Sequence, residues 1–456
     1  MSNTKRWLAL IILCLGDLMI VLDITIVNVA LPSIRTSLAF SETSLVWVVN
    51  AYMLTFGGCL LLGGRLGDLF GYRKLFLWGI ALFTIASLLC GLANSQNLLI
   101  CARAIQGIGG AIVSAVALSL IINLFTEPAE RAKAMGIFGF VGAGGGSIGV
   151  FLGGLLTDLF SWHWIFLVNI PIGIGVSILS LIFLPKEPAS SEPKHLDLMG
   201  AITITTSLML TVYAIINKNL TIFVVSIILF VIFLEIEKRV KSPIMPLHLF
   251  HLRNVTVSNL VAVLWAAGLY AWFFISALYL QFILGYTPLK VGLAFIPANL
   301  IMAIFSLGIS AKLVMKYGIK SILSIGLLCA SLGLLLLARA PINGHFIWDV
   351  LPCMCLIGLG GGIAFNPMLL ASMTDVPADE SGIASGLVNT SFMMGGSVGL
   401  ALLASIATLA TQSSLASGST QIGALNDGYH MAFLIGAFFA AVGSGLSLLL
   451  QIKNKS

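Results

Sequence analysis

The chain has 456 residues, of which 59% are hydrophobic and 9% are charged. Because charged residues make up about a quarter of a typical soluble domain, this composition excludes a soluble globular protein and indicates an integral membrane protein. The net charge of +6 does not point to a nucleic-acid partner. The basic residues collect in alternate short loops instead, which is the pattern that orients a membrane protein.

Apolar runs long enough for a transmembrane helix follow one another along almost the whole chain. The predicted spans are 8–31, 43–63, 75–94, 97–124, 133–157, 163–184, 198–216, 220–236, 255–284, 288–311, 320–339, 347–371, 383–409 and 429–451. The sequence therefore predicts an all-α polytopic membrane protein with fourteen spans. An even number places both termini on one side, and the basic residues near each terminus predict that this side is cytoplasmic, with the chain in the cytoplasmic membrane.

Two glycine-rich segments recur at an offset near 250 residues. Gly145–Gly149 of the fifth predicted span resembles Gly395–Gly399 of the thirteenth, and Gly107–Ile112 of the fourth resembles Gly358–Ile363 of the twelfth. This repetition predicts an N-terminal six-helix bundle (1–184), two inserted transmembrane helices with their loops (185–254) and a C-terminal six-helix bundle (255–456), the bundles being related by a pseudo-two-fold axis along the membrane normal. The alternative is that glycine-rich apolar segments resemble one another by composition alone.

Three charged residues lie well inside predicted spans, more than five residues from either end: Asp17, Asp23 and Arg103. A charge at such a depth costs about 2.5–3.5 kcal/mol or more and usually has a function. Asp23 and Arg103 lie at similar depths on oppositely directed helices, so the two side chains are expected to pair directly or through a relay. Protonation of Asp23 would weaken this pairing and bias a carrier between two states. The alternative is a permanent ion pair that only fixes helix packing.

Asp17 is six residues before Asp23, which places it roughly 120° around the helix. The two aspartates are therefore not expected to share a face. Asp17 is predicted nearer the membrane midplane, where it would attract a cationic ligand or bind a second proton. A hydrogen bond to a neighbouring helix is the alternative role.

The cytoplasmic end of the second predicted span combines small residues with charges. Gly63, Gly67 and Gly71 are spaced by four and allow a neighbouring helix to approach closely. The charged residues of this segment are Arg65, Asp68, Arg73 and Lys74. We interpret the segment as a gate whose charged contacts break on opening, the alternative being a topology signal with a helix cap. The fifth predicted span carries two further close-packing stripes, Gly142/Gly146 and Gly145/Gly149/Gly153.

Three segments, Leu22–Pro32, Gly64–Lys74 and Arg103–Ala111, resemble the signatures of the major facilitator superfamily in the correct order. With fourteen spans, the chain resembles the fourteen-spanner drug:proton antiporter branch of that family. The resemblance implies export of drugs or antibiotics by alternating access, a proton-coupling role for Asp23 with Arg103 in the same relay, and an inward gate at Asp68 and its basic neighbours. The antiporter motif of the fifth span is altered, because Gly146 stands where the family has a proline, and the direction of transport stays open.

Polar and aromatic residues within the spans are candidates for the lining of a substrate cavity: Asn28, Asn50, Tyr52, Gln106, Trp265, Tyr270, Trp272 and Asn389. No Gly-Lys dipeptide occurs, which excludes a P-loop and hence ATP as the direct energy source. We expect an amphipathic, cationic small molecule, protons and the lipid bilayer as partners, a monomeric chain, and no nucleic acid, cofactor, metal or catalytic site. The other functions considered are a dedicated carrier for one metabolite or self-made antibiotic, and a membrane sensor or intramembrane enzyme.

Overall fold

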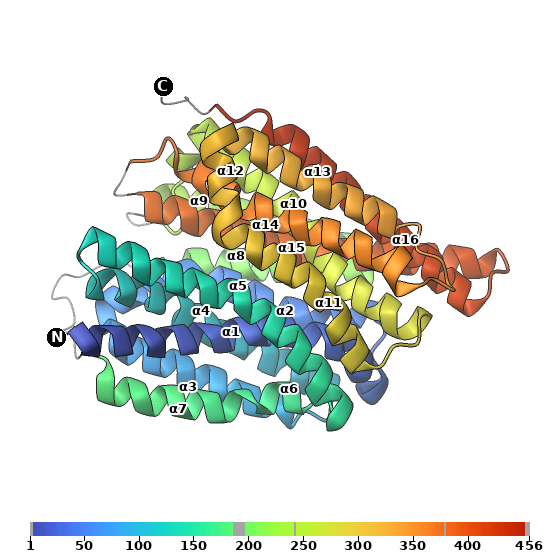
Figure 1. Cartoon of the computed structure of the whole chain (residues 1–456), viewed down its shortest axis with the longest axis horizontal. Helices are drawn as coiled ribbons and strands as arrows, with labels where there is room; N and C mark the ends of the chain where they lie inside the picture. The colour runs from blue at the N-terminus through green and yellow to red at the C-terminus, as the bar shows by residue number, and fades with distance from the viewer. Residues whose placement is uncertain (1–2, 186–196, 241–242, 378–379, 452–456) are drawn as a thin grey trace.

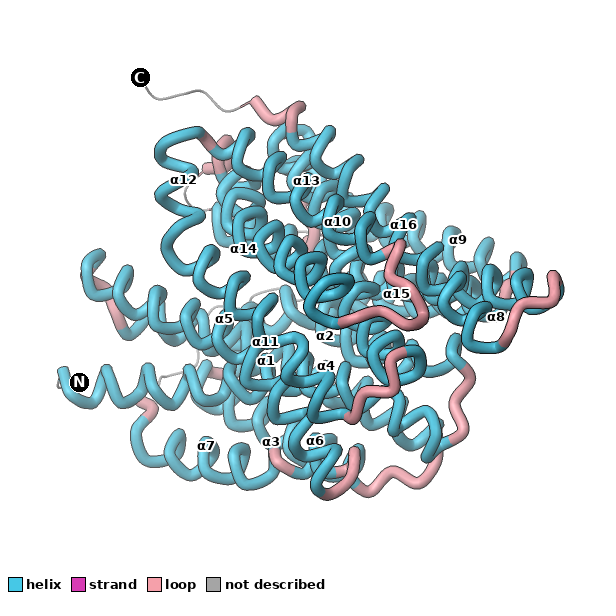
Figure 2. The backbone as a smooth tube through the Cα atoms, turned by 45° about the vertical axis from the view of Figure 1, so that its right-hand side comes forward, coloured by secondary structure: helices cyan, strands magenta, loops and turns pink. Residues whose placement is uncertain are grey.

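The computed structural model describes residues 3–185, 197–240, 243–377 and 380–451, and all regular structure in these ranges is helical (Figures 1 and 2). The α-helices are α1 (Asn3–Leu38), α2 (Glu42–Phe70), α3 (Tyr72–Gly91), α4 (Gln96–Leu124), α5 (Pro128–Leu159), α6 (Trp164–Leu167), α7 (Asn169–Phe183), α8 (Leu198–Asn217), α9 (Leu220–Arg239), α10 (Arg253–Leu278), α11 (Pro288–Ile304), α12 (Ser310–Tyr317), α13 (Ile319–Leu337), α14 (Leu351–Met373), α15 (Ser381–Ala416) and α16 (Gln421–Ser447). A 3₁₀ turn, η1 (Leu247–His251), and three π-helical turns, η2 (Tyr279–Ile283), η3 (Phe305–Ile309) and η4 (Phe346–Val350), complete them.

Thirteen helical segments of the described chain are long and apolar enough to cross a membrane, which confirms a polytopic all-α protein. The predicted fifth span corresponds to α5, a continuous helix of 32 residues. Its described apolar section, Ile148–Leu159, is shorter than a span. The count of fourteen therefore stays a prediction.

The first predicted span is too short. The helix continues beyond residue 31 through Pro32 to Leu38, because the backbone groups that a proline leaves unpaired are tolerated where neighbouring helices pack around them. Arg35, expected in a loop, lies in the last turn of α1 and forms a 2.9 Å ion pair with Glu42.

Several helices begin with a hydroxyl cap at the end of the molecule remote from the start of α1. The side chains of Ser41, Ser95, Thr287 and Thr420 each accept a hydrogen bond from a backbone N–H in the first turn of α2, α4, α11 and α16. These caps satisfy N–H groups that lack a partner inside the helix, so they fix the residue at which each helix begins.

Helices α1–α7 form one set and helices α10–α16 a second set, and each set packs mainly within itself (Figure 1). In the first set, α4 packs against α2 and α3, and α5 lies along α1. In the second set, α14 packs against α11 and α13, and α15 lies along α10. The two sets meet where α5 contacts α11 and α2 contacts α15, while α8 lies against α2 and α15 and carries α9 on its other side.

The repeated glycines make equivalent contacts in the two sets. On α5, Gly149 lies against α1, and a Cβ atom there would be 3.0 Å from the carbonyl oxygen of Leu22. On α15, the equivalent residue Gly399 lies against α10 at Ala267. The fourth and twelfth predicted spans agree as well: Gly107 packs on α2 as Gly358 packs on α11. Resemblance by composition alone does not predict matching neighbours, so these contacts favour internal repetition.

Two polar contacts join the two sets in the half of the molecule remote from the start of α1 and the end of α16. Gln281 donates to the carbonyl oxygen of Val29 at 2.8 Å, and Asn50 donates to that of Ser397 at 2.9 Å. Arg35 adds a cation–π contact with the ring of Phe282 at 4.9 Å. These contacts hold the two sets together at that end.

Candidate functional site

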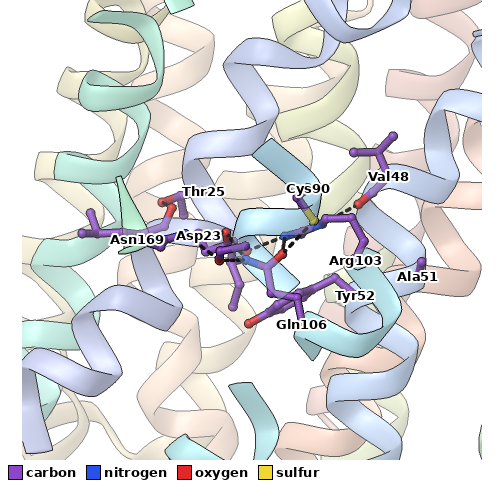
Figure 3. A network of polar contacts seen from close by, with 12 residues as sticks. Asp23, Thr25, Val48, Ala51, Tyr52, Cys90, Arg103, Gln106 and Asn169 are labelled. Atoms are coloured by element: carbon purple, nitrogen blue, oxygen red, sulfur yellow. Dashed lines mark hydrogen bonds and ion pairs between the residues drawn. The ribbon is translucent and has the colours of Figure 1, made fainter. Parts of the chain in front are cut away.

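A buried network of hydrogen bonds surrounds Asp23 in the middle of α1 (Figure 3). Its carboxylate is 0% exposed and forms an ion pair with Arg103 of α4. Oδ1 of Asp23 also accepts from the side-chain amides of Gln106 at 2.8 Å and Asn169 at 3.0 Å. The negative charge is thus met by three donors from two other helices, and the pairing expected from matched depth is present as a direct contact.

Arg103 connects this network to α2. Its Nε donates to the carbonyl oxygen of Val48 at 2.9 Å, and its Nη1 donates to Gln106 at 2.6 Å. The guanidinium carbon lies 4.4 Å from the centre of the Tyr52 ring and 5.6 Å from that of Phe166 in α6. Arginine favours such stacked, hydrogen-bonded positions because its charge is delocalised over a plane. Arg103 is 1% exposed, so the pair and its partners are closed to water here.

Three members of the network, Ser87, Cys90 and Asn169, were not predicted from the sequence. Ser87 of α3 accepts from Gln106 at 2.6 Å, Asn169 binds both Asp23 and Ser87, and the thiol of Cys90 donates to Gln106 at 3.7 Å. The only signal was their polarity within apolar runs, which does not identify a partner. The network unites α1, α2, α3, α4 and α7, so a change of charge at Asp23 is able to affect the packing of five helices.

Asp17 lies outside this network. Its Oδ1 accepts from the hydroxyl of Ser114 on α4 at 2.8 Å, its side chain is 7% exposed, and no ion pair is found for it among the described residues. Both aspartates contact α4, Asp23 through Arg103 and Gln106, and Asp17 through Ser114. A buried carboxylate with one neutral partner is costly in a membrane, and either a proton or a cationic ligand would lower that cost.

The predicted gate is described in part. Gly71 ends α2 with a φ of 85°, a conformation that favours glycine, and its N–H donates to the carbonyl oxygen of Gly67 at 3.0 Å. Gly67 lies against the ring of Tyr72, Arg73 donates to the carbonyl oxygen of Leu181 on α7, and Lys74 is exposed. The side chains of Arg65 and Asp68 lie outside the described residues, so the charged contacts of the gate stay a prediction.

One of the two glycine stripes predicted on α5 forms a helix contact. Gly145, Gly149 and Gly153 lie against α1, where a Cβ atom on Gly153 would be 2.5 Å from the carbonyl oxygen of Ile26. Gly146 has more room, because a Cβ atom there would have its nearest neighbour, the methyl group of Thr25, at 3.8 Å. Gly142 lies outside the residues whose surroundings are described.

Of the aromatic cavity candidates, Tyr52, Trp265 and Trp272 are buried in the observed conformation and Tyr270 is half-buried. Trp265 and Trp272 are 1% and 0% exposed, and the Trp272 ring lies 5.5 Å from that of Phe295. Tyr52 lies on Arg103, and the Tyr270 hydroxyl donates to the sulfur of Met393 at 3.3 Å. These four rings fix helix contacts in the observed conformation.

The polar cavity candidates mostly bind backbone. Asn28 and Asn389 donate to carbonyl groups one turn earlier in their own helices, at 3.3 Å and 3.1 Å. Asn50 links α2 to α15, and Gln106 belongs to the Asp23 network. None of the eight candidates lines the apolar cavity of about 510 Å³ that lies between α2, α8, α9, α10 and α15, which we call the lateral cavity.

Comparison with known sequences identifies the family. The sequence profile of the Major Facilitator Superfamily matches residues 13–400. The chain belongs to the major facilitator superfamily.

Several known proteins resemble the chain over most of its length. The puromycin resistance protein of Streptomyces alboniger is 37% identical, and the alignment covers 96% of this chain and 89% of that protein. The cephamycin export protein of Amycolatopsis lactamdurans is 34% identical, with 91% and 88% covered. A riboflavin transporter of Clostridioides difficile is 31% identical, with 86% and 87% covered. The chain is thus a membrane transporter, not an enzyme, and its relatives include drug and antibiotic exporters of this superfamily.

Solved structures agree on the fold. The crystal structure of a nucleoside transporter covers 97% of this chain with a TM-score of 0.71 at 12% sequence identity. At this identity the likeness concerns the arrangement of helices alone.

Proposed function

We propose that this transporter exports amphipathic drugs or antibiotics across the cytoplasmic membrane in exchange for protons, by alternating access. The observation that carries the proposal is the buried Asp23–Arg103 pair, held by donors from several helices in a chain whose relatives include antibiotic exporters. Ionised groups inside a membrane are costly, and in transporters they are commonly part of proton relays.

In the proposed cycle, the network holds Asp23 charged in the observed conformation. A proton that reaches Asp23 in another conformation cancels its charge, so Arg103 loses its counter-ion and the contacts among the surrounding helices weaken. Release of the proton on the other side of the membrane restores the pair. Alternating access then follows from movement at the α5–α11 and α2–α15 contacts.

The proposed architecture has fourteen spans, with α5 as the fifth. Residues 1–184 and 255–456 form two six-helix bundles related by a pseudo-two-fold axis, and residues 185–254 supply the two inserted helices. Both termini lie in the cytoplasm, and the working unit is a monomer. The equivalent glycine contacts on α5 and α15 support the two bundles.

Asp17 and the segment of the predicted gate have secondary roles in the proposal. Asp17 attracts a cationic substrate or carries a second proton, which its lack of an ion pair among the described residues supports. Asp68 and its basic neighbours close the cytoplasmic end. Replacement of Asp68 by asparagine is expected to reduce turnover while substrate binding is kept, and unchanged turnover would remove the gate from the proposal.

Drug accumulation in inverted membrane vesicles tests the coupling. Accumulation should require an imposed pH gradient in the wild type and should be lost in Asp23→Asn at equal protein content. The same change at an exposed position outside the network, Asp158→Asn near the end of α5, serves as the control. Accumulation that survives collapse of the gradient would reject proton coupling.

A dedicated carrier for one metabolite is the second candidate, which the likeness to a riboflavin transporter favours. Growth of a deletion strain on many chemically unlike drugs separates the two functions. Hypersensitivity to several unrelated compounds supports a multidrug exporter, whereas an effect on a single compound supports the dedicated carrier.

A further inference from the structure

Tyr52 of α2 lies along α4, with its ring and its hydroxyl at different levels of that helix. The ring centre lies 4.4 Å from the guanidinium carbon of Arg103, the partner of Asp23. The hydroxyl lies against Gly110, where a Cβ atom would be only 2.7 Å from the hydroxyl oxygen. Figure 3 shows the hydroxyl directed away from Arg103. The side chain therefore leads from the Asp23 network toward the following turns of α4.

The second buried aspartate is bound one turn further along α4. Ser114 follows Gly110 by four residues, which is about one turn, or roughly 6 Å, along the same face of the helix. Ser114 donates to Asp17 at 2.8 Å. The hydroxyl of Tyr52 thus lies between the levels of the two aspartates, and it interacts electrostatically with both.

The Tyr52 hydroxyl has no hydrogen-bond partner among the described residues, although the side chain is only 1% exposed. A buried hydroxyl without a partner lowers stability. A phenylalanine ring would make the same contacts with Arg103 and with Phe56 without that loss. The hydroxyl therefore needs an explanation other than stability.

The two aspartates differ in what stabilises their charge. Asp23 is 0% exposed and is paired with Arg103 and two side-chain amides, which favours its charged form. Asp17 is 7% exposed, and its hydrogen-bond donor is the neutral hydroxyl of Ser114. A proton on Asp17 removes a charge that is costly inside the membrane. The observed conformation thus favours a proton at Asp17 and a charge at Asp23.

We propose that the Tyr52 hydroxyl relays a proton between Asp17 and Asp23, so that the two aspartates belong to one proton path. The hydroxyl oxygen accepts the proton of Asp17 while its own proton passes to a carboxylate oxygen of Asp23. Tyr52 is unchanged after this step, Asp17 becomes charged, and Asp23 becomes neutral. The proposal rests on the proposed proton coupling and supplies the path by which the proton reaches the Asp23–Arg103 pair.

The relay is interrupted in the observed conformation, because the hydroxyl bonds neither aspartate. Tyr52 belongs to α2, which also contacts α15 of the second set, so a movement between the two sets is able to shift it. A path that was connected at all times would pass protons without any helix movement. An interruption that closes only in another conformation ties proton transfer to that movement. The other titratable side chains near the path are Cys14, Cys90 and Tyr270.

Accumulation of ethidium, a cationic amphipathic dye, in inverted membrane vesicles with an imposed pH gradient tests the relay. Tyr52→Phe removes one oxygen atom and should lower the initial rate about tenfold or more, as expected for a positioned proton-transfer group. The Kd for ethidium and the unfolding midpoint should not change for the worse, because the hydroxyl makes no hydrogen bond in the fold. Tyr213→Phe is the matched control, because Tyr213 is 44% exposed on α8. A wild-type rate in Tyr52→Phe, or a lower rate that comes with weaker ethidium binding, would overturn the relay.

A double variant tests whether the two residues act in one path. Asp17→Asn interrupts the proposed path at its other end. Tyr52→Phe/Asp17→Asn should therefore be no slower than the slower of the two single variants. Effects that multiply in the double variant would show that the residues act independently, and they would overturn the relay.

The same measurements separate the relay from the coupling itself. Wild-type accumulation that is unaffected by collapse of the pH gradient would reject the coupling and the relay together. Gradient-driven accumulation that is lost in Asp23→Asn but unchanged in Tyr52→Phe would overturn the relay and keep the coupling.

Discussion

The ion pair between Asp23 and Arg103 makes a quantitative prediction about stability. Arg103→Gln leaves the carboxylate fully buried, with Gln106 and Asn169 as its remaining donors. Asp23→Asn leaves a guanidinium that is 1% exposed, with the Val48 carbonyl oxygen and the Gln106 side chain as acceptors. Breaking a buried pair from one side typically costs about 3–5 kcal/mol, because the remaining charge has lost its counter-ion.

The double variant Asp23→Asn/Arg103→Gln should be more stable than either single variant. Replacement of a whole buried pair by neutral groups is often close to neutral, so we expect a total loss of about 1–3 kcal/mol, where simple addition predicts about 6–10 kcal/mol. The double variant also separates coupling from folding, since it should be well folded and still lack gradient-driven transport.

Thermal unfolding of the purified protein with a thiol-reactive fluorophore measures this effect. Cys14, Cys90 and Cys353 are 5%, 0% and 4% exposed, so their thiols react when the helices separate. Each single variant should unfold about 6–10 °C below the wild type, taking about 2 °C per kcal/mol for larger domains, and the double variant should recover most of that shift. Additive shifts in the double variant would refute the reasoning, because they would mean that the two charges do not stabilise one another.

Three further variants test other contacts. Gly153→Ala should lower the unfolding midpoint by the equivalent of about 1–3 kcal/mol, because the new Cβ atom would lie 2.5 Å from a backbone oxygen of α1. Gly175→Ala is the control, because a Cβ atom there would have nothing within 4 Å. Equal midpoints for the two variants would contradict the helix contact. Gln281→Leu removes the hydrogen bond to Val29 that joins the two sets of helices. Amide hydrogen exchange at the end of α1 should then rise about twofold to tenfold. Unchanged exchange would show that this hydrogen bond does not hold the two sets together. Ser114→Ala removes the one hydrogen bond found for Asp17 and should alter the KM for a cationic drug while the pH-gradient dependence persists; loss of that dependence would assign proton coupling to Asp17.

The central pair was predictable from the sequence because charges are rare in this chain and rarer still in its apolar runs. Two opposite charges at the same depth in a membrane are expected to pair, because few other counter-ions are available there. The rest of the network was not predictable. Ser87, Cys90 and Asn169 are neutral, and a neutral polar group in a transmembrane helix is commonly satisfied by its own backbone, as Asn28 is.

The substrate-cavity candidates were chosen by residue type alone. In the observed conformation Trp272 is buried against Phe295 and Tyr270 is half-buried, and their role in a substrate cavity stays a prediction. Residue type alone does not distinguish a ring that lines a cavity from one that fills the core, because a large apolar ring is favourable in both places. The lateral cavity consists mainly of ordinary apolar residues from separate helices, so no residue pattern in the sequence marks it.

The two halves of the chain share their packing but not their charges. Gly107 and Gly358 make equivalent contacts, yet the position four residues earlier is Arg103 in one case and the buried Met354 in the other. Among the described residues from 253 onward, no buried side chain is an aspartate, glutamate, lysine or arginine. If repetition supplied the scaffold, selection for transport added charge to one half only. In the proposed cycle the proton acts on the first half. The second half would then follow through the contacts at α2–α15 and α5–α11, which makes those two helix pairs the proposed mechanical link.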